Sequence, residues 1–433
     1  MRLRIRPANQ FGGAISVPGD KSISHRMLLL SALADGTSSL QGWLPAADCE
    51  ATLRCVRVLG VQVERPARDH LIVHGGGLRG LQPPSEPLDC GGSGTTMRLL
   101  MGILAGFPFP SVLIGNPQLS RRPMERVAQP LRQMGAEVFT TEGHAPVRVR
   151  GGFLHGIRYE LPMASAQVKS AILLAGLYAD CPTTVIEPAP SRDHTERLLQ
   201  AMGATIRKEG NSITIEPVEQ LHPLSLTIPG DPSSAAFLIA AALLIPGAHV
   251  QIPGVLLNPT RLGWLEAWQA MGASIQAIPE DEVGGERVGL LNASAAARLQ
   301  AIEIAGAIVP RMIDEFPIFA VVATQAEGVT RVRDAAELRV KESDRIAALA
   351  TELRRMGARI EEYADGFAIH GPTSLRGALV HSHGDHRLAM ALTVAGLIAQ
   401  GETVIEDADC IRDSFPGFVE TMQALGAEIE PTP

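Results

Sequence analysis

The chain has 433 residues, of which 45% are hydrophobic and 4% aromatic, and its formal net charge is −8. This length exceeds the size at which a single hydrophobic core stops growing, so two domains are expected, and the apolar content excludes a disordered chain. The acidic balance provides no general attraction to nucleic acid or to anionic membranes, so neither is expected as a partner.

Targeting segments and paired cysteines are not expected either. The longest strongly apolar run, residues 235–245, stops at Pro246 and is too short to cross a bilayer. The basic N-terminus has no apolar core, so it does not resemble a secretory signal. Five cysteines at irregular spacings, with no CxxC pair, favour reduced thiols in a cytoplasmic protein over disulfides or a metal site.

A short pattern recurs six times: Met or Leu, Gly, Ala or Val, any residue, then Val or Ile. Its glycines are Gly60, Gly135, Gly203, Gly272, Gly357 and Gly426. Each follows a stretch with helical apolar spacing and precedes a β-branched residue, which predicts a helix, a left-handed glycine and then a strand. The chain is therefore expected to contain six units of about 70 residues.

A longer repeat overlies these units. "VPGDKS" around Gly19 is echoed by "IPGDPS" around Gly230, which predicts two similar halves of three units each. The strand expected at residues 3–5 is assigned to the C-terminal half. We expect domain I to contain residues 1–16 plus 230–433 and domain II to contain residues 17–229, with an active-site cleft between them.

In chain order, the first candidate site precedes a helix predicted over residues 25–34. Lys21, Ser22 and Arg26 would place two cations and a hydroxyl near its N-terminus, where unpaired N–H groups attract anions. The alternative is that Ser22 or Ser24 caps the helix and the cations are solvated.

Two further helix starts carry glycines or arginines. "CGGSGTTMR" at residues 90–98 places Gly94 where a ligand could approach the backbone closely, although an ordinary glycine turn would look the same. Arg121 and Arg122 precede Pro123, which is expected at the first position of a helix. Forked guanidinium groups suit carboxylate or phosphate, and solvated arginines are the alternative.

Polar groups also precede three apolar helices. Ser165 and Gln167 stand before one and Arg192 before the next, where a helix cap is the alternative explanation. Asp314 and Glu315 stand before a third. A carboxylate there would be a cap or, if partly buried, a general base.

The densest charge cluster contains Lys341, Glu342 and Arg345. Lys341 and Arg345 are expected on one helical face, with a solvated, salt-bridged face as the alternative. Arg387 is expected in the first turn of a later helix. Cationic helix starts in both halves together predict an enzyme for small substrates rich in phosphate and carboxylate, in which lysine and carboxylate groups move protons.

Several longer motifs resemble one family over nearly the whole chain, the 5-enolpyruvylshikimate-3-phosphate synthases. The motifs are "PGDKSISHR", "GTTMR", "MASAQVKSA", "SRDHTE", "PGDPSSAAF", "MIDEFPI", "ELRVKESDRI" and "GDHRLAMA". The resemblance implies an α/β fold, the two-domain inside-out α/β barrel of the enolpyruvyl transferases, with three βαβαββ units per domain. It implies transfer of the enolpyruvyl group of phosphoenolpyruvate to the 5-hydroxyl of shikimate 3-phosphate, with release of phosphate and without metal or cofactor.

The resemblance also implies three sets of site residues. The catalytic set is Asp314, Glu342 and Lys21. The shikimate 3-phosphate set is Lys21, Ser22, Arg26, Ser165, Gln167, Arg192, Asp314 and Lys341. The phosphoenolpyruvate set is Lys21, Gly94, Arg122, Gln167, Arg345 and Arg387. A monomer is expected, with glyphosate as an inhibitor that is at least partly effective, because Gly94 lacks the methyl group that crowds this inhibitor in some tolerant members.

Two departures from the family pattern concern the phosphoenolpyruvate pocket. Gly92-Ser93 replaces the usual Asn-Ala, and Asp413 stands where many members have lysine.

Two functions are alternatives to that of the family. The UDP-N-acetylglucosamine enolpyruvyl transferases carry Lys-Asn at the position of Lys21-Ser22 and a reactive Cys before Arg-Pro, both absent here. A non-catalytic binder would hold both ligands and release no phosphate.

Overall fold

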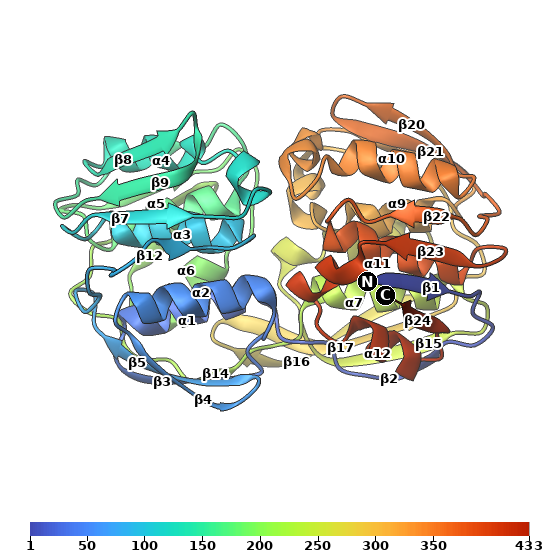
Figure 1. Ribbon diagram of the computed structural model, residues 1–433, viewed down its shortest axis with the longest axis horizontal. Coiled ribbons are helices and arrows are strands. Elements are labelled where there is room, and N and C mark those ends of the chain that lie inside the picture. The colour runs from blue at the N-terminus through green and yellow to red at the C-terminus, as the bar shows by residue number, and fades with distance from the viewer. Residues whose placement is uncertain (433) are drawn as a thin grey trace. The chain divides into compact units, whose positions relative to one another are not determined.

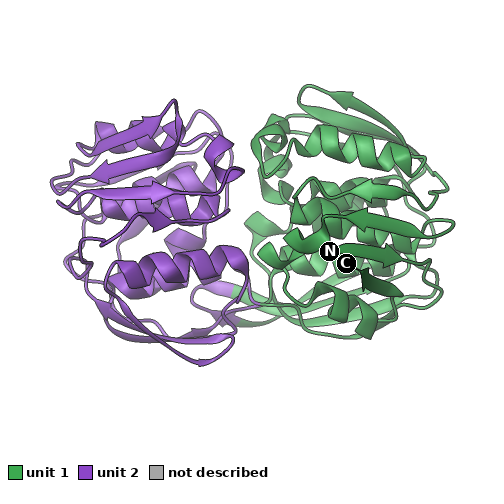
Figure 2. Ribbon diagram, in the orientation of Figure 1, with its two compact units in different colours: residues 1–18, 230–281, 287–433 green, residues 19–229, 282–286 purple. Residues whose placement is uncertain are grey.

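Two compact units make up the computed structural model, which describes residues 1–432 (Figures 1 and 2). Unit 1 contains Met1–Pro18, Gly230–Asp281 and the chain from Arg287 onward, and unit 2 contains Gly19–Pro229 and Glu282–Glu286. The first change of unit falls two residues after the boundary expected at 16/17. No sequence signal predicted the excursion of residues 282–286 into unit 2.

The six glycines end helices as predicted. All have positive φ, from 84° at Gly60 to 106° at Gly426, a region in which an L side chain is strained. The helices before them are α2 (Ala47–Val58), α4 (Glu125–Gln133), α6 (His194–Ala201), α8 (Gly263–Ala270), α10 (Arg345–Arg355) and α12 (Phe418–Ala424). The strands after them are β4 (Gln62–Ala67), β8 (Glu137–Thr141), β12 (Ile206–Glu209), β16 (Ile275–Val283), β20 (Arg359–Tyr363) and β24 (Ile429–Thr432).

Within residues 1–432, each unit contains three four-stranded sheets. In unit 2 the orders are β14 (Leu226–Thr227), β3 (Asp35–Gln41), β5 (His70–Gly76), β4; β6 (Leu88–Asp89), β7 (Ser111–Ile114), β9 (His144–Arg150), β8; and β10 (Arg158–Glu160), β11 (Thr183–Ile186), β13 (Ser212–Ile215), β12. In every one a parallel pair at one edge continues into antiparallel strands.

Unit 1 repeats this arrangement. Its orders are β16, β17 (Glu286–Ser294), β15 (His249–Leu256), β2 (Gly12–Ala14); β18 (Glu303–Ile304), β19 (Gly328–Val332), β21 (Gly366–Gly371), β20; and β22 (Leu379–His381), β23 (Thr403–Glu406), β1 (Arg2–Ile5), β24. The strand β1 lies between β23 and β24, with Leu3 opposite Ile405, so the N-terminal strand joins the C-terminal half as predicted.

Three buried helices form the interior of each unit, and the sheets lie outside them (Figure 1). They are α1 (Lys21–Leu33), α3 (Gly94–Leu104) and α5 (Ala166–Gly176) in unit 2, and α7 (Pro232–Leu244), α9 (Phe316–Ala323) and α11 (His386–Leu397) in unit 1. The strand β9 alternates buried and exposed side chains, as expected of a sheet with one face on the core. A helix without a polar face is stable only inside such a core, which explains the apolar run at residues 235–245.

No helix within residues 1–432 combines the length and the apolarity needed to cross a bilayer. All the apolar helices instead pack against other helices or sheets of their own unit.

Three details of the predicted helix starts are wrong. The first helix begins at Lys21 rather than at residue 25, because Asp20 caps it by accepting a hydrogen bond from the Ile23 backbone N–H at 2.7 Å. The helix α4 begins at Glu125, two residues after Pro123. Lys341 lies outside α10 and therefore shares no helical face with Arg345.

Candidate active site

Lys21 and Ser22 occupy the first turn of α1 in unit 2. The ammonium Nζ of Lys21 lies 3.1 Å from Asp48 Oδ2 in the first turn of α2, and both side chains are only slightly exposed. Because the N-terminus of a helix carries positive potential, Lys21 adds a cation where an anion is already favoured. Asp48 holds this ammonium in place, and it was not predicted from the sequence.

Arg26 and Arg192 both contact Ser22. The Arg26 guanidinium is buried and donates from Nη1 to the Ser22 carbonyl at 3.1 Å, while Arg192 Nη1 donates to Ser22 Oγ at 3.3 Å. Arg26 also donates to Thr195 Oγ1 at 2.7 Å and to Ser170 Oγ at 3.0 Å, which ties α1 to α6 and α5. The fold thus gathers three residues that are up to 170 positions apart in the chain.

Gln167 and Ser165 start α5 nearby. The buried Arg98 donates to Gln167 Oε1 at 2.5 Å, and Gln167 Nε2 donates to Thr95 Oγ1 at 3.0 Å, so both ends of the amide are fixed. Ser165 is the N-cap residue of α5, yet its hydroxyl makes no capping bond. The capping alternative therefore does not describe this hydroxyl.

Gly94 is the first residue of α3 and lies against two arginines. A Cβ at this position would be 2.7 Å from Arg98 Nη1 and 2.9 Å from Arg122 Nη1, so the glycine lets both guanidinium groups lie closer to the helix start than an alanine would. Ser93 caps the helix by accepting from the Thr96 backbone N–H at 3.1 Å. The departure at Ser93 therefore has a structural role.

Only one residue of the Arg121-Arg122 pair joins this group. Arg122 is buried, whereas Arg121 is exposed and donates to the Pro117 carbonyl at 3.2 Å. Arg121 therefore matches the solvated alternative, and Arg122 does not.

Arg345 gathers three carboxylates in unit 1. Its buried guanidinium lies 3.2 Å from Asp314 Oδ1, 2.7 Å from Glu342 Oε2 and 2.8 Å from Asp385 Oδ2. Burial works against its charged form, but the carboxylates of Asp385, Glu342 and Asp314 outweigh this and raise the pKa of Arg345 well above its ordinary value. Asp314 and Glu342, both predicted to move protons, are thereby held on one cation.

Asp385 connects this group to Arg387. It caps α11 by accepting from the Arg387 backbone N–H at 2.9 Å, and it also accepts from Ser343 Oγ at 3.1 Å. The Arg387 guanidinium is buried, with Nη1 at 3.8 Å from Glu315 Oε1. Asp385 and Glu315 therefore orient two arginines of the predicted phosphoenolpyruvate set.

Lys341 follows the short 3₁₀ helix η4 (Ala336–Val340) and is partly exposed. Burial of its ammonium lowers the pKa of Lys341, although the carboxylates of Asp314, Glu337 and Glu342 oppose the shift. A lysine with a lowered pKa close to carboxylates is typical of functional sites. The helix α10 begins at Arg345 and does not include Lys341, because Asp344 caps it by accepting a hydrogen bond from the Ala347 backbone N–H at 3.1 Å.

The predicted residues thus belong to charged clusters in both units, and in unit 1 the cations Arg345, Arg387 and Lys341 lie among carboxylates. Three residues that complete these clusters were not predicted as site residues, namely Asp48, Arg98 and Asp385, and Glu315 was named only beside Asp314 as a cap or a base. Arg98, Glu315 and Asp385 stand inside motifs that drew attention, so a search for partners within those motifs would have found them. Asp48 carries no local signal, because its pairing with Lys21 exists only in the folded chain.

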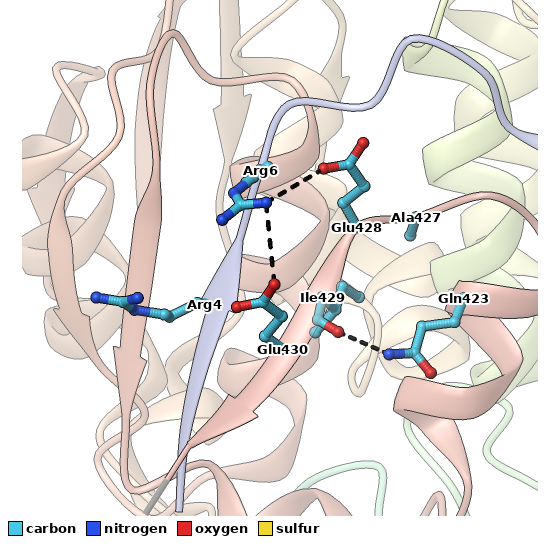
Figure 3. A pocket seen from close by; sticks show the side chains of 7 residues that line it. All are labelled: Arg4, Arg6, Gln423, Ala427, Glu428, Ile429 and Glu430. Atoms are coloured by element: carbon cyan, nitrogen blue, oxygen red, sulfur yellow. Dashed lines mark hydrogen bonds and ion pairs between the residues drawn. The ribbon is translucent and has the colours of Figure 1, made fainter.

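Two other features of the structure contribute no site residues. A pocket on unit 1 is lined by Arg4, Arg6, Gln423, Ala427, Glu428, Ile429 and Glu430 (Figure 3). Its charges balance one another, with Arg6 Nη1 at 3.8 Å from Glu428 and 3.9 Å from Glu430.

Within residues 1–432, the ligand atoms of Asp193, His194 and Glu286 lie within 4.8 Å of one another, close enough to hold a metal ion. The guanidinium of Arg197, 3.0 Å from Asp193, already supplies a positive charge there.

Known proteins resemble this chain over its full length. The family model described as EPSP synthase (3-phosphoshikimate 1-carboxyvinyltransferase) matches residues 5–422. A 3-phosphoshikimate 1-carboxyvinyltransferase from Desulforamulus reducens is 49% identical over 430 residues, covering 99% of this chain and 100% of that protein. A protein of the same name from Desulforudis audaxviator is 50% identical over 430 residues, with the same coverage of both chains.

Solved structures agree. The EPSP synthase from Acinetobacter baumannii superposes with a TM-score of 0.88 at 43% identity, covering 99% of this chain and 100% of that chain. The enolpyruvyl transferase NikO from Streptomyces tendae gives a TM-score of 0.81 at 19% identity, covering 100% of this chain and 98% of that chain, which is a likeness of fold alone. The predicted fold class is confirmed. The chain belongs to the EPSP synthase (3-phosphoshikimate 1-carboxyvinyltransferase) family, and is a transferase of the shikimate pathway with the enolpyruvyl transferase fold.

Proposed function

We propose that the charged clusters of the two units carry out the family's reaction, transfer of the enolpyruvyl group of phosphoenolpyruvate to the 5-hydroxyl of shikimate 3-phosphate. In unit 2, the cluster of Ser22, Arg26 and Arg192 would bind the phosphate of shikimate 3-phosphate, because hydroxyl and guanidinium donors converge there beside a helix N-terminus. Ser165 would contact the same substrate, since its hydroxyl makes no capping bond, and Gln167, which the resemblance assigns to the same set, is held in place by Arg98 and Thr95.

Phosphoenolpyruvate needs cations for both its carboxylate and its phosphate. The candidate cations are Lys21 and Arg122 in unit 2 and Arg345 and Arg387 in unit 1, and Gly94 and Gln167 are the uncharged members of the same proposed set. Carboxylates hold the buried guanidinium groups of Arg345 and Arg387, and Arg122 packs closely against Gly94. These guanidinium groups are therefore oriented before a ligand binds.

Proton transfers would complete the reaction. Asp314 accepts the 5-hydroxyl proton while the oxygen attacks C2 of phosphoenolpyruvate, and Glu342 or Lys21 donates a proton to C3. The tetrahedral adduct then loses a C3 proton to the same group as the bond from C2 to the phosphate oxygen breaks, which restores the double bond. The leaving phosphate oxygen takes up the proton that Asp314 removed from the 5-hydroxyl, so that Asp314 is again a carboxylate and phosphate departs as HPO4²⁻. Atoms and charges balance without a metal or a covalent enzyme intermediate.

One observation carries this assignment. Asp314 and Glu342 both contact the guanidinium of Arg345, a predicted phosphoenolpyruvate ligand, at 3.2 and 2.7 Å. A base for the hydroxyl and an acid for the methylene carbon must both reach the same reacting pair of substrates. Their shared contact with one arginine supports these paired roles.

Phosphate release tests the proposal. The enzyme should release phosphate from phosphoenolpyruvate when shikimate 3-phosphate is added, and none when UDP-N-acetylglucosamine is added. Asp314→Asn should lower kcat by about 10²–10⁴-fold and leave the Kd for shikimate 3-phosphate within a few fold, as expected for loss of a general base. The exposed Asp69→Asn is the matched control.

Three outcomes would contradict the assignment. Phosphate release with UDP-N-acetylglucosamine would favour the sister transferase activity, and binding of both ligands without phosphate release would favour a binding protein. Full turnover by Asp314→Asn would remove Asp314 from the mechanism.

The expected monomer, the cytoplasmic location and inhibition by glyphosate belong to the same proposal. We expect glyphosate sensitivity because Gly94 places no methyl group beside the guanidinium groups of Arg98 and Arg122. Inhibition that competes with phosphoenolpyruvate supports it, and no competition at millimolar glyphosate refutes it.

A further inference from the structure

Residues 282–286 form the tip of a hairpin whose strands, β16 and β17, otherwise belong to unit 1. The tip belongs to unit 2, where Glu286 is buried against α6. A hydrogen bond of 2.6 Å joins Glu286 Oε1 to His194 Nδ1, and both side chains are almost fully buried. A buried carboxylate is costly without such a partner, so this contact defines where the tip docks.

Arg197 makes the same connection one turn further along α6. Its Nη1 donates to the Gly285 carbonyl at 2.7 Å, and its Nε lies 3.7 Å from Glu286 Oε2 and 3.0 Å from Asp193 Oδ1. The tip is therefore held by backbone and side-chain contacts to the first turns of α6. The residue directly before this helix start is Asp193, and before it comes Arg192.

The other side of Arg192 is anchored by a second buried charge group. Lys169 Nζ lies 2.8 Å from Glu187 Oε2 and 2.7 Å from Glu196 Oε1, and these two carboxylates hold the pKa of Lys169 above its ordinary value against the opposing effect of burial. Lys169 also donates to the Ser191 carbonyl at 3.4 Å, and Ser191 Oγ donates to Glu187. The backbone is thus fixed on both sides of Arg192.

We propose that Glu286 is a positioning residue for the shikimate phosphate site, acting through His194 on the segment that carries Arg192. Arg192 donates to Ser22 at 3.3 Å only while this segment keeps its position. If Glu286 no longer holds His194, the segment samples other conformations, and the apparent affinity falls by the fraction that stays competent. The inference rests on the phosphate-binding role proposed for Arg192.

Calorimetric titration of the full-length enzyme with shikimate 3-phosphate tests the inference. Glu286→Gln should raise the Kd about tenfold, as expected if one molecule in ten keeps the competent segment. It should raise the KM for shikimate 3-phosphate similarly and leave kcat within about twofold, because saturating substrate selects the competent form. Glu280→Gln, in the exposed part of the same hairpin, makes the same charge change and should leave the Kd unchanged.

The double variant separates positioning from stability. Arg192→Ala with Glu286→Gln should bind no more weakly than Arg192→Ala alone, because residues that act through one another are not additive. A lower unfolding temperature with an unchanged Kd in Glu286→Gln would make the contact merely structural and overturn the inference. If Arg192→Ala itself leaves the Kd unchanged, the proposed phosphate site fails instead. Should Glu286→Gln not fold, Arg197→Gln releases the tip at Gly285 and serves for the same comparison.

Discussion

At the scale of single residues, buried charges in this chain are held by several partners at once. Arg345 contacts Asp314, Glu342 and Asp385, and Arg26 contacts Ser22, Ser170 and Thr195. Burial of a charge is tolerated only with such partners. The same contacts orient each fork before a ligand binds, so stability of the fold and preorganisation of the site have one physical cause.

Lys341 gives a pH-dependent prediction. The family resemblance implies that Lys341 binds shikimate 3-phosphate, which requires its cationic form, and burial lowers its pKa. The positive charge of Lys341 is present below this lowered pKa and is lost as the pH rises through it. The kcat/KM for shikimate 3-phosphate should therefore begin to fall at a lower pH than it would if Lys341 had the pKa of an ordinary lysine. Lys341→Arg should keep the charge and move the fall to higher pH, measured between about pH 7 and pH 10.

The exposed Lys208→Arg is the matched control for this prediction and should reproduce the wild-type profile. If kcat/KM of Lys341→Arg falls at the same alkaline pH as that of the wild type, the titration of another group causes the fall.

At the scale of elements, one device ends six helices. Each glycine adopts a positive φ and turns the chain from a helix into a strand, which is why a five-residue pattern in the sequence marked every repeat. The helix starts were less predictable. A side chain that caps a helix, as Asp20 and Asp344 do, shifts the start by several residues without altering the apolar pattern.

Two of these glycines form a matched pair. A Cβ at Gly357 would meet nothing within 4 Å, whereas a Cβ at Gly203 would lie 2.8 Å from the His222 ring, and their φ angles are 91° and 96°. Gly357→Ala should therefore cost about 1–2 kcal/mol of unfolding free energy through backbone strain alone. Gly203→Ala should cost more, because the imidazole must also move. Urea unfolding measures both, and equal losses would contradict the steric part of the argument.

At the scale of the whole molecule, each unit has its own buried helices and its own three sheets. Most residues proposed to bind shikimate 3-phosphate lie in unit 2, on α1, α5 and the segment before α6. The substrate alone should therefore stabilise the units unequally.

Hydrogen exchange measures this inequality. At a concentration of 100 times its Kd, shikimate 3-phosphate stabilises the bound state by about 2.7 kcal/mol. Amide exchange should slow in α1 and α6 more than in α12 of unit 1, which carries none of the proposed ligands. Equal slowing in all three helices would mean that shikimate 3-phosphate stabilises both units alike. Unchanged exchange in α1 and α6 would contradict their proposed role in binding.

The sequence by itself determined the six repeats and the helix-glycine-strand order within them. It also determined that the N-terminal strand belongs with the C-terminal half, and to which family the chain belongs. These depend on local patterns, namely apolar spacing, glycine at positive φ and contiguous motifs, which a chain displays without being folded. Only the tertiary structure decided that Asp314, Glu342 and Asp385 share Arg345, that Asp48 holds Lys21, and that residues 282–286 belong to unit 2. These contacts depend on packing between segments that are far apart in the chain. No local sequence pattern predicts which distant side chain will be in contact after folding.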